Sequence, residues 1–302
     1  FTPVQHPAND MECGITTTHF DYHSIDHNLL KLDILGHDDP TMIRTLEDYI
    51  TSDAMENEYN EEHPFVATEI PLDDKKVIEL FHGTEILGIK PEDIDGCKLG
   101  CLGIPEFGTD FVIQMVQDTK PQTLSDLIRI SGLSHGTNVW LGNAQELVKS
   151  GKATISTAIC TRDDIMIYLI NKGVESALAF TIMESVRKGK GLKPEWEEAM
   201  KAQDVPDWYI WSCKKISYMF PKAHAAAYVM MAYRIAYCKI NYPLAYYGAY
   251  FGIRADAFSY AIMCQGKDKL NYYMKDYKKR SDTLTKKEQD VMKDMKIVQE
   301  MY

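Results

Sequence analysis

The chain has 302 residues, of which 45% are hydrophobic, and it carries a formal net charge of −11 at pH 7. This composition allows a substantial core, and no stretch approaches the roughly 18 uninterrupted apolar residues of a membrane-spanning helix, so we expect no membrane segment. The chain begins with Phe1 and shows no signal-peptide pattern, and its seven scattered cysteines favour reduced thiols in the cytoplasm.

The first part of the chain predicts a little β-structure. Residues 1–36 alternate polar and apolar side chains and end in the apolar run Leu29–Gly36, which predicts a buried strand closed by glycine. Asp38-Asp39-Pro40 is a helix-start signal that leads into Thr41–Ile50, and the polar residues 51–64 predict a loop.

From Asp73 onward the pattern is helical. A capped helix over residues 73–81 precedes an irregular region, 84–109, that is rich in Gly and Pro. Helical periodicity then recurs over 109–116, 123–131, 143–150, 162–172, 174–188, 194–202, 207–220, 222–241 and 243–254. The predicted fold class is therefore α+β and mostly α, with a small β-containing start followed by a large helical body.

Asp33 is the most informative single residue. An ionised carboxylate inside a strand of Leu and Ile is costly unless it is paired or bound to a cation. Mg²⁺ prefers a few carboxylates plus substrate phosphates, so Asp33 suits a metal ligand for phosphoryl transfer. An aspartate that caps the turn at Gly36 explains the residue equally well.

His19, His23 and His27 recur every four residues and, together with Asp33, suggest a metal-dependent hydrolase as one alternative. The flanking Thr, Phe and Tyr favour extended structure, and no H-E-x-x-H arrangement is present. Ordinary hydrogen-bonded histidines are the preferred interpretation.

A second candidate segment is Arg129–Thr137, where glycines, serines, a histidine and an arginine follow a predicted helix. Small residues allow close backbone approach, and amides, hydroxyls and a guanidinium can hold phosphate oxygens. No Walker loop is present, and a helix C-cap followed by a turn is the simpler explanation of this segment alone.

A third candidate is Phe220–Tyr228, which begins an Ala-rich helix that continues past Arg234 to Lys239. His224 and Tyr228 are four residues apart and share a face. Cations for phosphates and a ring for a base suit a nucleoside triphosphate, although an ordinary core helix has the same periodicity.

The segment Lys267–Lys287 is basic in an otherwise acidic chain, and it includes Lys278, Lys279 and Arg280. Local charge matters more than net charge when a polyanion binds, so this segment is a candidate for DNA contact. A solvated helix face is the alternative.

Together and in this order, three segments resemble motifs of the PolC-type bacterial DNA polymerase III alpha subunit. Residues 30–40 (LKLDILGHDDP) are similar to its last palm motif, and residues 128–137 (IRISGLSHGT) with 140–144 (WLGNA) resemble its fingers. Residues 220–228 (FPKAHAAAY) with 233–237 (YRIAY) also resemble the fingers. The likeness extends from about Phe1 to Arg254.

The resemblance implies a role for each segment. Residues 1–50 would be the end of the palm, 51–260 a helical fingers domain, and 261–302 a basic segment leading toward duplex DNA and the clamp-binding region. Asp33 would be the third of the aspartates that hold two Mg²⁺ ions. Arg129, Ser131, Ser134 and His135 would lie near the nucleotide phosphates, and Lys222, His224 and Tyr228 near the nucleotide.

The implied function is template-directed nucleotide addition in a bacterial replisome. The implied partners are primer-template DNA, deoxynucleoside triphosphates, a sliding clamp and other replication proteins. The family's other two metal-binding aspartates belong to an Asp-x-Asp segment, and nothing ahead of Asp33 matches it. We therefore expect the chain alone to be inactive, and a non-catalytic nucleotide- or DNA-binding module remains the main alternative.

Overall fold

The computed structural model describes residues 1–32, 34, 36–52 and 54–302. The chain divides into two compact units, Phe1–His37 and Asp38–Tyr302. The first unit contains the antiparallel pair β1 (Val4–Gln5) and β2 (Thr17–Thr18), in which Val4 is opposite Thr18. Two 3-10 turns, η1 (Pro7–Asn9) and η2 (Tyr22–Ser24), complete it.

The predicted buried strand over Leu29–Gly36 is wrong for the residues that can be described there. Leu30, Leu32 and Ile34 lie outside any strand and are 85%, 75% and 95% exposed. A strand needs a hydrogen-bonded neighbour, and in the described part of this unit β1 and β2 pair only with each other. Asp33 lies outside the described residues.

The second unit is helical, as predicted. Its α-helices are α1 (Asp39–Thr51), α2 (Lys75–Leu80), α3 (Asp110–Thr119), α4 (Leu124–His135), α5 (Gln145–Lys149), α6 (Arg162–Lys172), α7 (Ser176–Arg187), α8 (Pro194–Ala202), α9 (Asp207–Lys215), α10 (Lys222–Asn241), α11 (Pro243–Ala249), α12 (Tyr260–Met263), α13 (Lys267–Lys279) and α14 (Lys286–Met301). Short helical turns are η3 (Ala67–Glu69), η4 (Glu85–Leu87), η5 (Pro91–Ile94), η6 (Trp140–Ala144), η7 (Tyr250–Arg254) and η8 (Ser281–Thr283). The fold class is therefore mostly α with a small β part.

Local sequence signals explain many helix starts. The hydroxyl of Thr123 accepts a hydrogen bond from the Asp126 backbone N–H at 3.2 Å, and the Asp126 carboxylate accepts from the Thr123 N–H at 3.1 Å. The same reciprocal capping box joins Thr285 and Glu288 at the start of α14. Each box satisfies N–H groups that a helix start leaves without partners.

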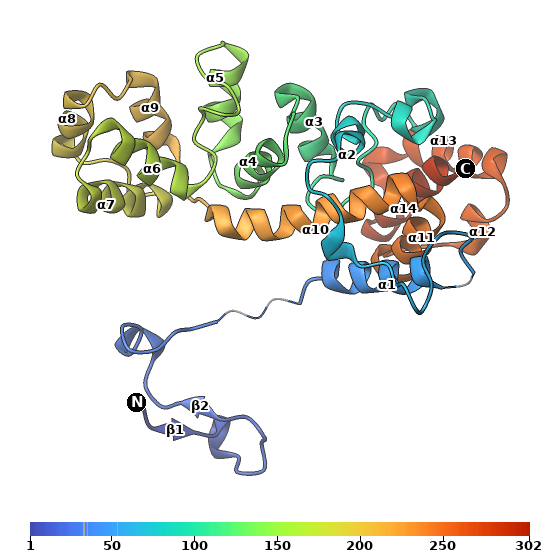
Figure 1. Ribbon diagram of the computed structural model, residues 1–302, viewed down its shortest axis with the longest axis horizontal. Coiled ribbons are helices and arrows are strands. Elements are labelled where there is room, and N and C mark those ends of the chain that lie inside the picture. Colours follow the sequence, from blue (N-terminus) through green and yellow to red (C-terminus); the bar gives the residue numbers. More distant parts are fainter. Residues whose placement is uncertain (33, 35, 53) are drawn as a thin grey trace. The chain divides into compact units, whose positions relative to one another are not determined.

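α10 is the central element of the second unit. Figure 1 shows it running from the neighbourhood of α6 and α7 to that of α1, α2 and α11, with α4 beside it, and α10 packs against α4, α1, α2 and α11. Its Tyr233 is fully buried and donates a hydrogen bond to the backbone oxygen of Asp74 at 2.9 Å. The helix therefore joins the N-terminal and C-terminal parts of this unit.

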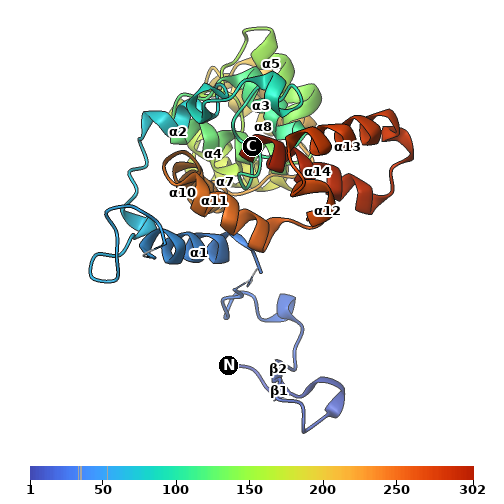
Figure 2. The same ribbon diagram turned by 90° about the vertical axis from the view of Figure 1, so that its right-hand side faces the viewer.

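The last helices form a separate small cluster in which α13 lies beside α14 (Figure 2). Its buried core consists of Met263, Leu270, Met274, Val291, Met295 and Val298. The predicted domain limits at residues 50 and 260 remain predictions, while the contacts divide the chain at His37 and Asp38, ahead of α1. No helix within the described residues is both long and apolar enough to cross a membrane.

Candidate functional site

The second and third sequence motifs meet where α4 ends and α10 begins. The helix predicted to end at Ser131 continues to His135, so Gly132 lies inside α4. A Cβ atom on Gly132 would lie 2.7 Å from the backbone oxygen of Cys160 and 2.7 Å from Cγ2 of Thr161. This glycine therefore serves the close approach of α4 to the start of α6.

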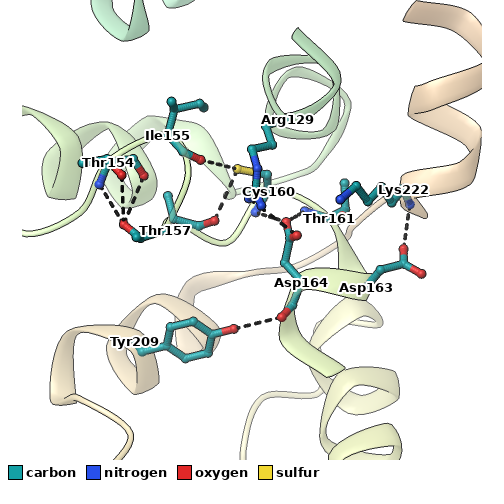
Figure 3. Close-up of polar contacts among 11 residues, drawn as sticks. Arg129, Thr154, Ile155, Thr157, Cys160, Thr161, Asp163, Asp164, Tyr209 and Lys222 are labelled. Carbon is teal, nitrogen blue, oxygen red and sulfur yellow. Dashed lines mark hydrogen bonds and ion pairs between the residues drawn. The ribbon is translucent and has the colours of Figure 1, made fainter. Parts of the chain in front are cut away.

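Arg129 is held against that start of α6. Its Nη1 lies 3.6 Å from Oδ1 of Asp164, and both side chains are largely buried (Figure 3). The other carboxylate oxygen of Asp164 accepts hydrogen bonds from the N–H groups of Cys160 and Thr161 at 3.1 and 2.9 Å. One aspartate thus caps α6 and orients Arg129. Burial raises the pKa of the Cys160 thiol to about 12, which makes this thiol unreactive.

The neighbouring Asp163 holds the start of α10. Its Oδ2 accepts a hydrogen bond from the backbone N–H of Lys222 at 2.6 Å, as Figure 3 shows. The backbone N–H of Arg162 donates to the oxygen of Phe220 at 3.1 Å. The first turns of α6 and α10 are therefore fixed to each other by both side-chain and backbone contacts.

The helix predicted to continue to Phe220 ends at Lys215. A residue that precedes proline is disfavoured in helical conformation, and Pro221 follows Phe220. The extended stretch instead pairs with the end of α4, since the Thr137 N–H donates to the Tyr218 oxygen at 2.9 Å. This pairing places Phe220 beside the end of α4.

Phe220 joins the two motifs through its ring. Its centroid lies 5.5 Å from that of His135 on α4 and 4.9 Å from that of His224 on α10. His224 in turn lies 4.6 Å from Tyr228, one turn further along α10. His135, Phe220, His224 and Tyr228, here called the aromatic row, therefore form a continuous series of rings.

The end of α4 also holds a polar network. The hydroxyl of Ser131, a residue only 2% exposed, donates to Oε2 of Glu106 at 3.0 Å. His135 Nδ1 lies 2.8 Å from the Ser131 oxygen, and its Nε2 lies 3.4 Å from the same Glu106 oxygen. The Ser134 hydroxyl donates to the Ser131 oxygen at 2.9 Å. Glu106, Ser134 and His135 line an open cavity of about 770 Å³, which residues of α14 also line.

Asp33 of the first motif lies outside the described residues, and its role as a metal ligand stays a prediction. Among the residues that are described, no group of three or more His, Cys, Asp or Glu side chains is arranged to hold a metal ion. His19 instead contacts Gln5 Oε1 at 2.8 Å, and His27 lies 3.4 Å from Asp26. These contacts are those of ordinary hydrogen-bonded histidines.

The candidate DNA-binding residues lie at the end of α13. Lys278 forms an ion pair with Asp95. Arg280 contacts Asp276 at 3.0 Å and Glu288 at 3.1 Å. Lys279 is exposed and forms no ion pair with the described residues. Two of these three predicted cations are therefore already paired within the chain.

Lys239, which the sequence grouped with the cations of α10, is fully buried far along the helix and forms an ion pair with Glu300. Sequence reasoning also missed Glu106 and Asp163. Asp164 was detectable in principle, because Thr161-x-x-Asp164 matches a capping box.

The comparisons with known proteins agree with this arrangement. The family model of the bacterial DNA polymerase III alpha subunit finger domain matches residues 39–204, more than half of the chain. The chain belongs to this finger-domain family. This match, together with the PolC-type relatives described next, confirms the resemblance found from the sequence motifs.

Curated relatives of the finger-domain chain are proteins named DNA polymerase III PolC-type. Those of Oceanobacillus iheyensis and Staphylococcus aureus are each 54% identical to it, and that of Bacillus subtilis is 55% identical, over 301 residues in every case. The match covers 100% of this chain but only 20% of each relative. The chain therefore corresponds to about a fifth of a PolC-type polymerase.

Proposed function

We propose that this chain is the part of a replicative DNA polymerase that binds the incoming deoxynucleoside triphosphate. One observation carries the proposal: the Phe220 ring contacts both His135 and His224, so two motifs that are far apart in the sequence form one surface. The family membership of the chain supports the same conclusion.

The residue types at this surface suit the chemistry of a nucleotide. Arg129, Lys222 and His135 supply cationic or hydrogen-bonding groups of the kind that hold phosphate oxygens. The aromatic row supplies ring faces on which a base can stack. Both neighbouring carboxylates are engaged within the chain: Asp163 accepts the Lys222 N–H, and Asp164 caps α6 and pairs with Arg129.

The magnesium part of the proposal rests on Asp33 alone. Mg²⁺ is usually held by one or two carboxylates plus substrate phosphates, where it neutralises charge and lowers the pKa of an attacking hydroxyl. No described cluster of acids in this chain fits a pair of such ions. We therefore assign Asp33 as one ligand only, and the remaining carboxylates would be contributed from outside these residues.

The whole protein would join a nucleotide to a primer 3′ end on a DNA template and release pyrophosphate. Its partners would be primer-template DNA, nucleotides, a sliding clamp and other replication proteins in the bacterial cytoplasm. The chain alone would bind a nucleotide without catalysing primer extension, since a single carboxylate does not hold two metal ions.

Single-nucleotide incorporation by the full-length protein tests the proposal. His135→Ala and His224→Ala should each raise the KM for the nucleotide by about tenfold, a factor equivalent to one charge-assisted hydrogen bond or stacking contact. Asp33→Asn should abolish turnover while leaving the Kd for primer-template DNA nearly unchanged. Lys152 is exposed and belongs to none of the three motifs, so Lys152→Ala serves as a control.

Normal incorporation kinetics in both histidine variants would refute the nucleotide-binding role. Normal turnover in Asp33→Asn would refute the metal-ligand role. Primer extension by the isolated 302-residue chain would show that these residues carry the whole catalytic site, contrary to the proposal.

A further inference from the structure

The Glu106 carboxylate contacts two side chains near the end of α4, those of Ser131 and His135. It lies in the segment between η5 and α3, far from α4 in the sequence. A single oxygen, Oε2, accepts the Ser131 hydroxyl at 3.0 Å and lies 3.4 Å from His135 Nε2. The Glu106 side chain is 10% exposed and that of His135 is 38% exposed, so the acid lies behind the ring.

The backbone of Glu106 adopts a conformation that favours glycine. Its φ is +69°, in the left-handed region that favours glycine. A residue with a side chain in this region lowers the stability of the fold. Gly103, three residues earlier, has a similar φ of +72°. A turn with no other role would therefore be better served by glycine, and the carboxylate explains why glutamate stands at position 106.

The contacts of Glu106 fix the orientation of the His135 ring. The backbone oxygen of Ser131 can only accept, so Nδ1 of His135, 2.8 Å away, carries a proton and donates to it. Nε2, on the opposite edge of the ring, lies 3.4 Å from the Glu106 carboxylate and pairs with it when this nitrogen also carries a proton, that is, in the imidazolium form. The Ser131 hydroxyl also donates to Glu106, so the same carboxylate oxygen contacts both Ser131 and His135.

We propose that Glu106 is a positioning residue for nucleotide binding: it holds the His135 ring against Phe220 and toward the nucleotide. Ser131, which is buried, completes this support rather than contacting phosphate. The inference rests on the proposed function, in which His135 lies near the incoming nucleotide. Glu106 itself touches neither nucleotide nor DNA in this role.

Three substitutions at position 106 of the full-length protein separate positioning from mere stability. Glu106→Ala and Glu106→Gly both remove the carboxylate and should raise the KM for the nucleotide by about tenfold, with kcat and the Kd for primer-template DNA changed less than about threefold. The Gly variant should have the higher Tm of the two, because glycine tolerates the positive φ. Glu106→Gln should stay within about threefold of the wild-type KM, since its amide oxygen can accept from the Ser131 hydroxyl and its amide nitrogen can donate to Nε2 of His135.

Glu47→Ala is the control variant, because it removes a half-buried carboxylate that is not part of the α4 network. Oε1 of Glu47 accepts a hydrogen bond from the Ala67 N–H at 2.9 Å, and neither residue belongs to the α4 network. This variant should lower Tm without changing the KM. Figure 1 places α1, which carries Glu47, at the other end of the second unit from α6 and α7.

The outcomes distinguish this inference from the proposed function. If His135→Ala raises the KM while Glu106→Ala and Glu106→Gly do not, the positioning role is overturned and the nucleotide site stands. If the KM follows Tm, so that the Gly variant is less impaired than the Ala variant, Glu106 is only structural and the inference fails. If His135→Ala has no effect, the proposed function fails first.

Discussion

Lys239 of α10 and Glu300 of α14 form an ion pair in which Nζ and Oε1 are 2.5 Å apart and both side chains are fully buried. Lys239 also donates to the backbone oxygens of Gly100 and Leu102, each at 2.7 Å. The Tyr247 hydroxyl donates to Glu300 Oε1 at 2.8 Å. A loop and three helices therefore meet at one buried charge pair.

Lys239→Met should strongly destabilise the fold. Burial raises the pKa of the Glu300 carboxyl and Lys239 opposes that shift, so the variant leaves a buried acid without its cation. Breaking a buried pair in this way costs about 3–5 kcal/mol in the free energy of unfolding. Urea unfolding measures this free energy. The double variant Lys239→Met with Glu300→Leu should recover much of the lost stability. A cost below about 1 kcal/mol for the single variant would contradict the assigned role.

Gly132→Ala should separate α4 from the start of α6. The added Cβ would meet the Cys160 backbone oxygen at 2.7 Å, and a backbone atom cannot rotate away as a side chain can. Forcing extra volume into a packed contact costs about 1–3 kcal/mol. Gly252→Ala is the control, since nothing lies within 4 Å of its added Cβ. Equal stability of the two variants by urea unfolding would show that α4 does not depend on this approach.

The pH dependence of stability should carry a contribution from Glu184 on α7. Hydrogen bonds from Arg187 lower its pKa from 4.5 to about 2. A carboxyl whose pKa is depressed in the folded state stabilises the fold above its unfolded pKa, and this stabilisation is lost as pH falls. Between about pH 4.5 and 2, wild-type stability should therefore fall more steeply than that of Glu184→Gln, a difference on the order of 1 kcal/mol. Parallel unfolding curves over that range would contradict the assignment.

Helices with local signals were predictable from the sequence. The periodicity and caps of α3, α4, α6, α8 and α10 are contained within a few residues of each element, as in the Thr123–Asp126 box. The site contacts are different, because Phe220 meets His135, and Ser131 meets Glu106, only after the chain has folded. A local sequence pattern does not indicate which distant residue a side chain will contact.

Two of the departures from the predictions, among the described residues, share a physical reason. The run Leu29–Gly36 is apolar enough for a strand, but strand formation depends on a pairing partner rather than on the run itself. Lys239 has the spacing of an exposed helix cation, yet its position faces Glu300 at the far end of the chain. In both cases the deciding interaction is distant in the sequence.

The α13 cations should contribute unequally to DNA binding. Lys278 and Arg280 already pair with carboxylates of the chain, whereas Lys279 forms no ion pair with the described residues. Each phosphate contact adds about 0.9 to the slope of log K against log salt concentration. Lys279→Gln in the full-length protein should therefore reduce the slope by about 1, and neutralising Lys278 or Arg280 should reduce it by less.

Single variants are compared because they separate the contribution of Lys279, which forms no ion pair with the described residues, from those of the paired Lys278 and Arg280. Lys152→Gln, an exposed lysine elsewhere, controls for net charge. If all four variants keep the wild-type salt slope, α13 is a solvated helix face and does not touch DNA. If Lys278 and Arg280 contribute as much as Lys279, DNA binding must break their ion pairs with Asp95, Asp276 and Glu288. These variants would then lower stability more in the presence of DNA than in its absence, because they bind the stabilising DNA less tightly.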